Sequence, residues 1–215
     1  MSLKNATLFI IIILVLDQVS KIYIKTNFML QEDVEVFSWF KIFFVENPGM
    51  AWGAKLSDVF IFLSDETAKV VLTVFRIFAV TGIGYWFCMS IKKGANKTLV
   101  IAVALIFAGA LGNIIDSVFY GVIFNDSYGN VAEFLPEGGG YAGWFHGKVV
   151  DMLHFPIWNG TFPTWMPFFG GEAFTFFQPV FNIADVAIST GVGILLVFNK
   201  KAFSAPDERY RLLME

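Results

Sequence analysis

The sequence predicts an all-α membrane protein with four transmembrane helices, a small extracytoplasmic β-sheet and an aromatic-rich outer loop. Of the 215 residues, 56% are hydrophobic and 26 are phenylalanine, and the mean hydropathy is +0.65, far from the balance of soluble proteins. Four apolar stretches approach the length of about 20 residues that a helix needs to cross the hydrocarbon core. We expect one membrane-embedded domain over residues 1–215.

The expected helices and the segments between them follow from the local sequence. The apolar stretches cover about 6–24, 69–91, 98–119 and 180–198. Within the first outer segment, about 25–68, aromatic and β-branched residues alternate in "VEVFSWFKI", which predicts strand, and Asn47-Pro48-Gly49 predicts a turn. The second outer segment, about 120–179, contains "FPIWNGTFPTWMPFFGG". Its Gly, Pro, Trp and Phe predict an irregular loop at the membrane interface, serving as a lid or an anchor.

The distribution of basic residues predicts the orientation. Lys92, Lys93 and Lys97 lie in the link between the second and third stretches, and four more lysines and arginines follow the fourth stretch. Lys148 is the only base in 120–179. Because cytoplasmic loops carry an excess of Lys and Arg, we expect both termini in the cytoplasm and both long segments outside.

Several classes of function are excluded by what the chain lacks. No basic run suggests a nucleic-acid partner. The single cysteine, Cys88, and the absence of H-E-x-x-H argue against a metal site. Serine–histidine catalysis is disfavoured, because the only histidines are His146 and His154 and there is no G-x-S-x-G elbow. We therefore expect no metal and no cofactor, and carboxylates remain as the reactive groups.

Polar residues gather at the outer ends of the expected helices. Asp17 lies in the outer half of the first helix, and two Asn-Ile-x-Asp motifs stand at the end of the third and the start of the fourth. Each motif puts an asparagine on the same helix face as an aspartate, at i and i+3, while Asp17 and Lys21 are an i, i+4 pair. Such groups could merely join helices by hydrogen bonds, but convergence from three helices favours a site.

Two carboxylates close together and poorly solvated share a proton, so that one acts as general base toward water and the other as general acid. This is the chemistry of aspartic proteases. A small transporter or channel with a carboxylate site and a non-catalytic assembly subunit are the alternatives; clustering toward one face gives no relay across the bilayer. The residues alone leave open which two of four aspartates form the pair: Asp17, Asp116, Asp151 or Asp185.

Five motifs in order then resemble one family. "DQVSK", "ENPGMAWG", "GALGNIIDS", "VVDM" and "FNIADVAIS" are similar to the signature of lipoprotein signal peptidase, the type II signal peptidase of bacteria. The resemblance implies a membrane aspartic endopeptidase of the bacterial inner membrane with an outward-facing active site. It implies cleavage of the signal peptide from diacylglyceryl-modified prolipoproteins immediately before the lipidated cysteine. The implied partners are this substrate and membrane lipid, with the chain acting as a monomer.

The resemblance also assigns residues by motif. It implies that Asp151 and Asp185 are the catalytic aspartates. Asp116 would organise the site, Asn182 would hold Asp185, and the small side chain of Ala184 would leave room for the substrate backbone. The full set of substrate-binding or site-supporting positions carried over is Asp17, Lys21, Asn47, Gly49, Gly109, Asn113, Asp116, Asn182 and Ala184.

One position departs from the family's pattern. The family usually reads G-N-x-x-D-R in the third helix, and here Ser117 stands at the arginine position. An arginine would supply several hydrogen-bond donors to substrate. We hypothesise that Arg76 in the second helix reaches the same site and replaces it, because a charged arginine facing lipid would be unfavourable. The alternatives are that Arg76 pairs with Asp116 or extends toward the interface.

Overall fold

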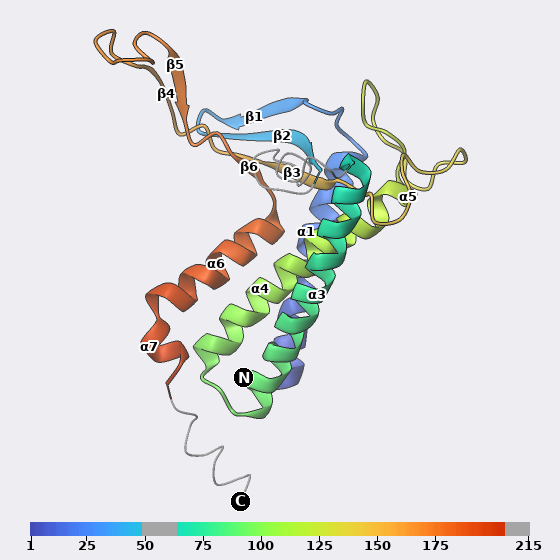
Figure 1. Ribbon diagram of the computed structural model, residues 1–215, viewed down its shortest axis with the longest axis vertical. Coiled ribbons are helices and arrows are strands. Elements are labelled where there is room, and N and C mark those ends of the chain that lie inside the picture. Colours follow the sequence, from blue (N-terminus) through green and yellow to red (C-terminus); the bar gives the residue numbers. More distant parts are fainter. Residues whose placement is uncertain (49–63, 205–215) are drawn as a thin grey trace, which may run out of the picture.

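The computed structural model describes residues 1–48 and 64–204, which form a helix bundle with a β-sheet across one end (Figure 1). In this part of the chain, three helical stretches are long and apolar enough to cross a membrane: α1 (Leu3–Lys25), α3 (Asp65–Lys92) and the continuous run Lys97–Ile123. A shorter apolar helix, α6 (Ile183–Val197), follows near the C-terminus, and the short α7 (Asn199–Ala202) continues from it.

Side-chain caps fix where the long helices begin. Ser2 and Ser64 accept hydrogen bonds from the backbone N–H groups of Asn5 and Thr67, at 3.3 and 3.2 Å, which satisfies donors that a helix N-terminus leaves unpaired. The third stretch is not uniform. It consists of α4 (Lys97–Ile115), a π-helical turn η2 (Asp116–Tyr120) and α5 (Gly121–Ile123). Such π turns occur frequently at functional sites, and this one begins at Asp116.

Helix α4 occupies the centre of the bundle and contacts α1, α3 and α6. Small residues permit the closest of these contacts. A Cβ atom at Gly109 would lie 2.2 Å from the carbonyl oxygen of Ala184, and one at Gly191 would lie 2.6 Å from that of Ala102. Helices in membranes pack through such small residues because lipid supplies no hydrophobic drive for their association. The backbones of α4 and α6 therefore approach closely, which fixes α6 relative to the bundle.

An antiparallel sheet of four strands covers one end of the bundle (Figure 1). Its order is β1 (Asp33–Phe37), β2 (Phe40–Asn47), β3 (Val149–His154) and β6 (Val180–Phe181). Phe44 of β2 and Val150 of β3 are fully buried and pack with Ile24 and Tyr120 of the helices. The first residues of the chain, the α3–α4 connection and α7 lie at the opposite end (Figure 1).

The sequence-based expectations hold for part of this architecture. Strands β1 and β2 confirm the small sheet expected within 25–68; the Gly49 part of the expected turn lies outside the described residues. The prediction of an irregular loop over 120–179 is wrong in part, because β3, β4 (Trp158–Thr161) and β5 (Ala173–Phe176) lie there. The helix expected over 180–198 starts later, since Val180 and Phe181 pair with β3 before α6 begins.

Candidate active site

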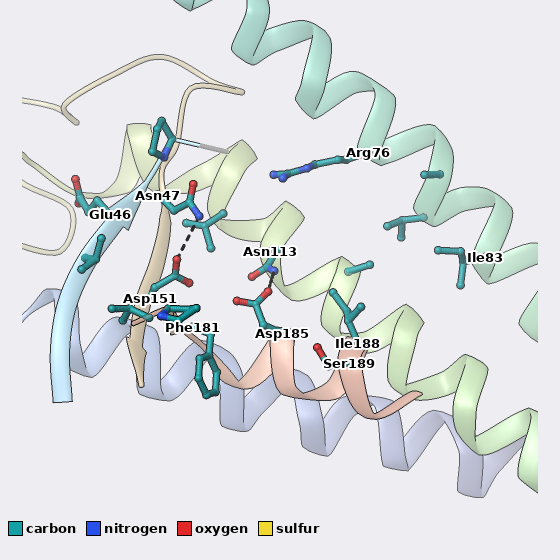
Figure 2. A pocket seen from close by; sticks show the side chains of 18 of the residues that line it. Glu46, Asn47, Arg76, Ile83, Asn113, Asp151, Phe181, Asp185, Ile188 and Ser189 are labelled. Carbon is teal, nitrogen blue, oxygen red and sulfur yellow. Dashed lines mark hydrogen bonds between the residues drawn. The ribbon is translucent and has the colours of Figure 1, made fainter. Parts of the chain in front are cut away.

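A pocket of about 800 Å³ lies between the sheet and helices α3, α4 and α6. Asp151 from β3 and Asp185 from α6 line it, and Arg76 reaches it from α3. Figure 2 shows the carboxyl groups of both aspartates and the guanidinium of Arg76 directed into the same space. The lining also includes apolar side chains of the helices, among them Ala79, Val80, Ile83, Ala110 and Ile188.

Asp151 lies on strand β3, and two amide side chains hold its carboxyl group. Asn182 Nδ2 donates to Asp151 Oδ1 at 2.7 Å, and Asn47 Nδ2 donates to Oδ2 at 3.4 Å. Only 4% of the residue is exposed. Burial, together with the negative charge of Asp185, raises the pKa of Asp151 to about 7, although the charge of Lys21 and the two amides oppose that rise. Near neutral pH this carboxyl is therefore poised to hold a proton.

Asp185 stands in the first turn of α6, inside a capping box. Its backbone N–H donates to Asn182 Oδ1 at 2.9 Å, and its own Oδ2 accepts from the backbone N–H of Asn182 at 3.3 Å. Asn113 Nδ2 donates to the other oxygen, Oδ1, at 2.9 Å (Figure 2). The positive end of the α6 dipole adds to these donors. Both oxygens of this carboxyl therefore accept hydrogen bonds from N–H donors.

A buried ionic cluster lies behind the pocket. Lys21 Nζ is 3.0 Å from Asp17 Oδ2 and 2.8 Å from Asp116 Oδ2. It also donates to Asn113 Oδ1 at 2.8 Å. All three charged side chains are at most 1% exposed. Because desolvated charges are stable only when paired and hydrogen-bonded, the lysine and its two aspartates must stay together in the folded protein.

This cluster accepts hydrogen bonds from both elements that carry the pocket aspartates. Asp116 Oδ2 accepts the backbone N–H of Val150, next to Asp151, at 3.3 Å. Asp17 Oδ1 accepts the backbone N–H of Ala184, next to Asp185, at 2.9 Å. The charges contributed by α1 and η2 thereby fix β3 and the start of α6 relative to each other.

The structure distinguishes the four aspartates that the sequence left equivalent. Asp151 and Asp185 line the pocket, whereas Asp17 and Asp116 pair with Lys21 behind it. Ala184 is fully buried against α4, and its Cβ lies 3.4 Å from where a Cβ of Gly112 would lie, so it serves helix packing; its expected effect on substrate space stays a prediction. Gly109 has the same packing role, and Gly49 lies outside the described residues.

Arg76 and Ser117 lie in different surroundings. Arg76 lines the pocket, and Asp116, its alternative partner, is already paired with Lys21. Ser117 is 2% exposed, and its hydroxyl donates to the backbone oxygen of Asn113 at 2.9 Å within its own helix. In the described part of the chain, then, the guanidinium that lines the pocket is that of Arg76 on α3. It comes from a different helix from Ser117, the position expected to hold arginine.

Two residues of this region were not predicted from the sequence. Gln18 Nε2 donates to Asp17 Oδ2 at 3.0 Å and to Asp116 Oδ1 at 2.9 Å, which bridges the two carboxylates. Its position beside Asp17 in a transmembrane stretch was the available signal.

Glu46 is the second missed residue. It is buried at the pocket edge and binds both Lys25 and Lys148. Burial opposes its charge, but the two ammonium groups lower the pKa of this carboxyl below its ordinary value. Its place directly before Asn47 in "ENPG" was the signal.

Comparisons with known proteins agree on one family. A family model described as signal peptidase (SPase) II matches residues 9–200. The lipoprotein signal peptidase of Porphyromonas gingivalis strain W83 is 47% identical over 195 residues, which cover 90% of this chain and 82% of the relative. The lipoprotein signal peptidase of Amoebophilus asiaticus is 35% identical over 200 residues, which cover 91% of this chain and 78% of the relative.

A solved structure described as a bacterial membrane enzyme, determined by the in meso method, has a similar fold. The TM-score is 0.59 at 25% identity, and the alignment covers 94% of this chain and 91% of that chain.

Proposed function

This chain belongs to the signal peptidase II family, and from that premise we propose that it is an aspartic endopeptidase with Asp151 and Asp185 as its catalytic pair. As a family member it is a bacterial multi-pass membrane protease that cleaves signal peptides from prolipoproteins. The observation that supports the catalytic pair is that these two aspartates share one pocket, with Asp151 shifted to a pKa of about 7.

The different surroundings of the two carboxyls suggest their roles. Asp185, held by N–H donors, takes a proton from water as the water oxygen attacks the scissile carbonyl carbon. Protonated Asp151 donates its proton to the carbonyl oxygen, which gives a neutral tetrahedral diol. When the C–N bond breaks, Asp185 gives its proton to the departing nitrogen and Asp151 recovers one from the diol, so both carboxyls return to their starting states.

Arg76 is proposed to bind a substrate carbonyl. The guanidinium carries several N–H donors in a fixed geometry and remains charged at physiological pH. Figure 2 shows the guanidinium extending into the pocket that Asn113 and Asp185 also line, so its donors lie on the side of the proposed site of reaction. A carbonyl oxygen of the scissile peptide or of the diacylglyceryl group could accept hydrogen bonds from this guanidinium. Asn47, Asn113 and Asn182 serve as positioning residues for the two aspartates.

The apolar end of the pocket suggests where the lipid goes. Val80 and Ile83 of α3, Ala110 of α4 and Ile188 of α6 all line the pocket. We propose that α6 is the fourth transmembrane helix and that acyl chains of the diacylglyceryl cysteine lie between these helices. The scissile bond, just before that cysteine, then falls beside Asp151 and Asp185.

Orientation and assembly complete the proposal. The lysines of the α3–α4 connection lie at the end of the bundle opposite the sheet (Figure 1). This supports cytoplasmic termini and an active site that faces outward across the inner membrane. Both aspartates, their amide partners and Arg76 come from a single chain, which supports a monomer as the active form.

The test is cleavage of a diacylglyceryl-cysteine prolipopeptide by purified protein in nanodiscs, followed by mass spectrometry. Wild type should cut immediately before the lipidated cysteine, and Asp151→Asn and Asp185→Asn should each reduce the rate by at least about 10²–10⁴-fold, the usual contribution of an acid or base. Asp33→Asn is the matched control, because Asp33 is 51% exposed on β1. Wild-type rates in either pocket variant would exclude this catalytic pair.

A further inference from the structure

The hairpin formed by β4 and β5 has one aromatic face and one polar face. Its register pairs Trp158 with Phe176 and Gly160 with Phe174, and these residues alternate with the pairs Asn159–Thr175 and Thr161–Ala173. Residues directly opposite in an antiparallel pair share a face, and successive pairs point to opposite faces. Trp158, Phe174 and Phe176 therefore lie on one face, while Asn159, Thr161 and Thr175 lie on the other.

The aromatic face and the connecting turn are exposed in the protein itself. Trp158 is 63% exposed and Phe176 58%, and in the turn Trp165 is 80% and Phe168 94% exposed. Phe168 also has a φ of 72°, a strained conformation for a bulky residue that is typical of functional segments. Glu172 is the only charged residue between Phe155 and Val180. A two-stranded hairpin with such a surface is at best marginally stable in water, so it requires a cover.

The position of the hairpin relative to α6 restricts which surface can contact its aromatic face. Only six residues separate Phe176 from Ile183, the first residue of α6, a span of roughly 20 Å when extended. The base of the hairpin therefore lies close to the level at which α6 leaves the membrane. Figure 1 shows the hairpin extending obliquely outward from β6, on the side of α6, so that its turn lies beyond the sheet.

We propose that residues 157–177 form an arm that lies on the outer leaflet, with the aromatic face and the Trp165–Phe169 turn buried at the boundary between headgroups and acyl chains. Trp and other aromatic rings concentrate at this depth in membrane proteins, and amphipathic elements bury their apolar face about 5–10 Å into it. The near absence of charge matches contact with lipid better than contact with water.

The observations favour lipid over substrate or a second copy. The arm's turn extends away from the bundle, and none of residues 157–177 lines the pocket. The neighbouring helix α6 also has exposed apolar side chains, since Val186 and Val192 are 43% and 41% exposed. This arm goes beyond the proposed catalytic function and does not depend on it. It gives the enzyme a second, laterally displaced attachment to the membrane that steadies the sheet bearing Asp151.

Site-directed spin labelling tests the arm directly. In a Cys88→Ala background, Phe168→Cys and Asn159→Cys are labelled separately in nanodiscs of phosphatidylethanolamine and phosphatidylglycerol that contain one protein copy. Collision with oxygen, which concentrates in lipid, is compared with collision with a water-soluble nickel chelate. The Phe168 label should favour oxygen several-fold more strongly than the Asn159 label, which samples the polar face of the same hairpin. Trp165→Cys repeats the measurement should Phe168→Cys fold poorly.

Each contrary result has a definite meaning. Equal access of the nickel chelate to the turn and to position 159 would show an arm in water, and the proposal would be wrong. Shielding of the turn only after a lipopeptide substrate is added would show a lid over the substrate. Shielding only in nanodiscs that hold two copies would show self-association. Cleavage activity is not part of this readout, so the result stands whether or not Asp151 and Asp185 are catalytic.

Discussion

Asp151 and Asp185 lie in one pocket but are held by different kinds of structure. The first sits on a strand, with side-chain amides as its donors, and the second sits at a helix N-terminus, where a backbone N–H and the helix dipole assist. Burial raises the pKa of Asp151, and the negative charge of Asp185 raises it further. The asymmetry that an acid–base pair requires is thus built into the secondary structure.

This asymmetry predicts the alkaline limb of the pH profile. The pKa of Asp151 is raised from 3.8 to about 7, so its protonated form persists below about pH 7 and is lost above it. The kcat/KM of the enzyme should fall about tenfold per pH unit above that value. Rates measured from about pH 5 to about pH 9 with a short prolipopeptide check this; a flat profile would contradict a protonated Asp151.

The same shift predicts a pH dependence of stability. A carboxyl whose folded pKa lies above its unfolded value stabilises the fold fully below the unfolded pKa, and that contribution is lost as pH rises through the folded pKa. Asp151 should therefore weaken the fold between about pH 4 and pH 7. Asp151→Asn should be at least as thermally stable as wild type at neutral pH. Thermal melts of both proteins in detergent test this, and a large drop in the variant's Tm would refute it.

Arg76 and Ser117 allow a matched test of the displaced guanidinium. Arg76→Ala should lower kcat/KM by roughly 10–100-fold, which corresponds to the loss of a charged hydrogen bond of about 1.5–3 kcal/mol, and Arg76→Lys should recover part of the activity. Ser117→Ala should change the rate little, because the Ser117 hydroxyl serves only its own helix in the contacts described. Equal rates for wild type and Arg76→Ala would exclude the role proposed for Arg76.

At the scale of elements, the close packing of α4 against α6 sets the position of Asp185. A Cβ at position 109 would meet the Ala184 carbonyl oxygen at 2.2 Å and Ile188 Cγ1 at 2.8 Å, so Gly109→Ala must push α6 outward. We predict a loss of stability of about 1–3 kcal/mol and a marked fall in kcat. Gly193→Ala on α6 is the control, because nothing lies within 4 Å of its Cβ position. Thermal melts and cleavage rates of both variants test this prediction. Equal Tm and kcat values for Gly109→Ala and Gly193→Ala would contradict it.

Lys21 of α1 pairs with two carboxylates, those of Asp17 and Asp116, and through them it is connected to η2, β3 and α6. Lys21→Met would leave Asp17 and Asp116 buried without their counter-ion, which typically destabilises a fold by about 3–5 kcal/mol. Neutralising both aspartates in the same chain, as Lys21→Met with Asp17→Asn and Asp116→Asn, should recover much of that stability. Thermal melts of the single and triple variants test this. No recovery in the triple variant would show that the hydrogen bonds of the carboxylates to Val150 and Ala184 matter more than their charges.

The elements also show what a sequence can and cannot predict. Periodicity and spacing identified the long helices and the helix-borne groups Asp17, Asn113 and Asp116, because these relations are local. The place of Asp151 is different, since it depends on pairing between β2 and β3, and Asn47 and Asp151 are 104 residues apart. The motif resemblance singled out Asp151, but its burial came from that long-range pairing, which no local pattern records.

At the scale of the whole molecule, the apolar outer faces of the helices and the pocket fit one substrate path. The pocket lining joins α3 to α6 through residues of α4, and in the proposed mechanism a lipid-anchored substrate reaches the aspartates between these helices. A pocket at the sheet end is useful only if that end meets the leaflet that holds the lipidated cysteine. Orientation is therefore part of the mechanism.

Labelling of single cysteines tests the proposed orientation. In a Cys88→Ala background, Glu137→Cys lies in an exposed loop on the sheet side of the bundle, and Ser204→Cys follows α7 at the opposite end. A membrane-impermeant maleimide should label position 137 in intact spheroplasts and position 204 only after permeabilisation, because Lys92, Lys93 and Lys97 predict a cytoplasmic α3–α4 end. The reverse pattern would put Asp151 and Asp185 on the cytoplasmic side, away from the lipidated cysteine, and would contradict the mechanism proposed for them.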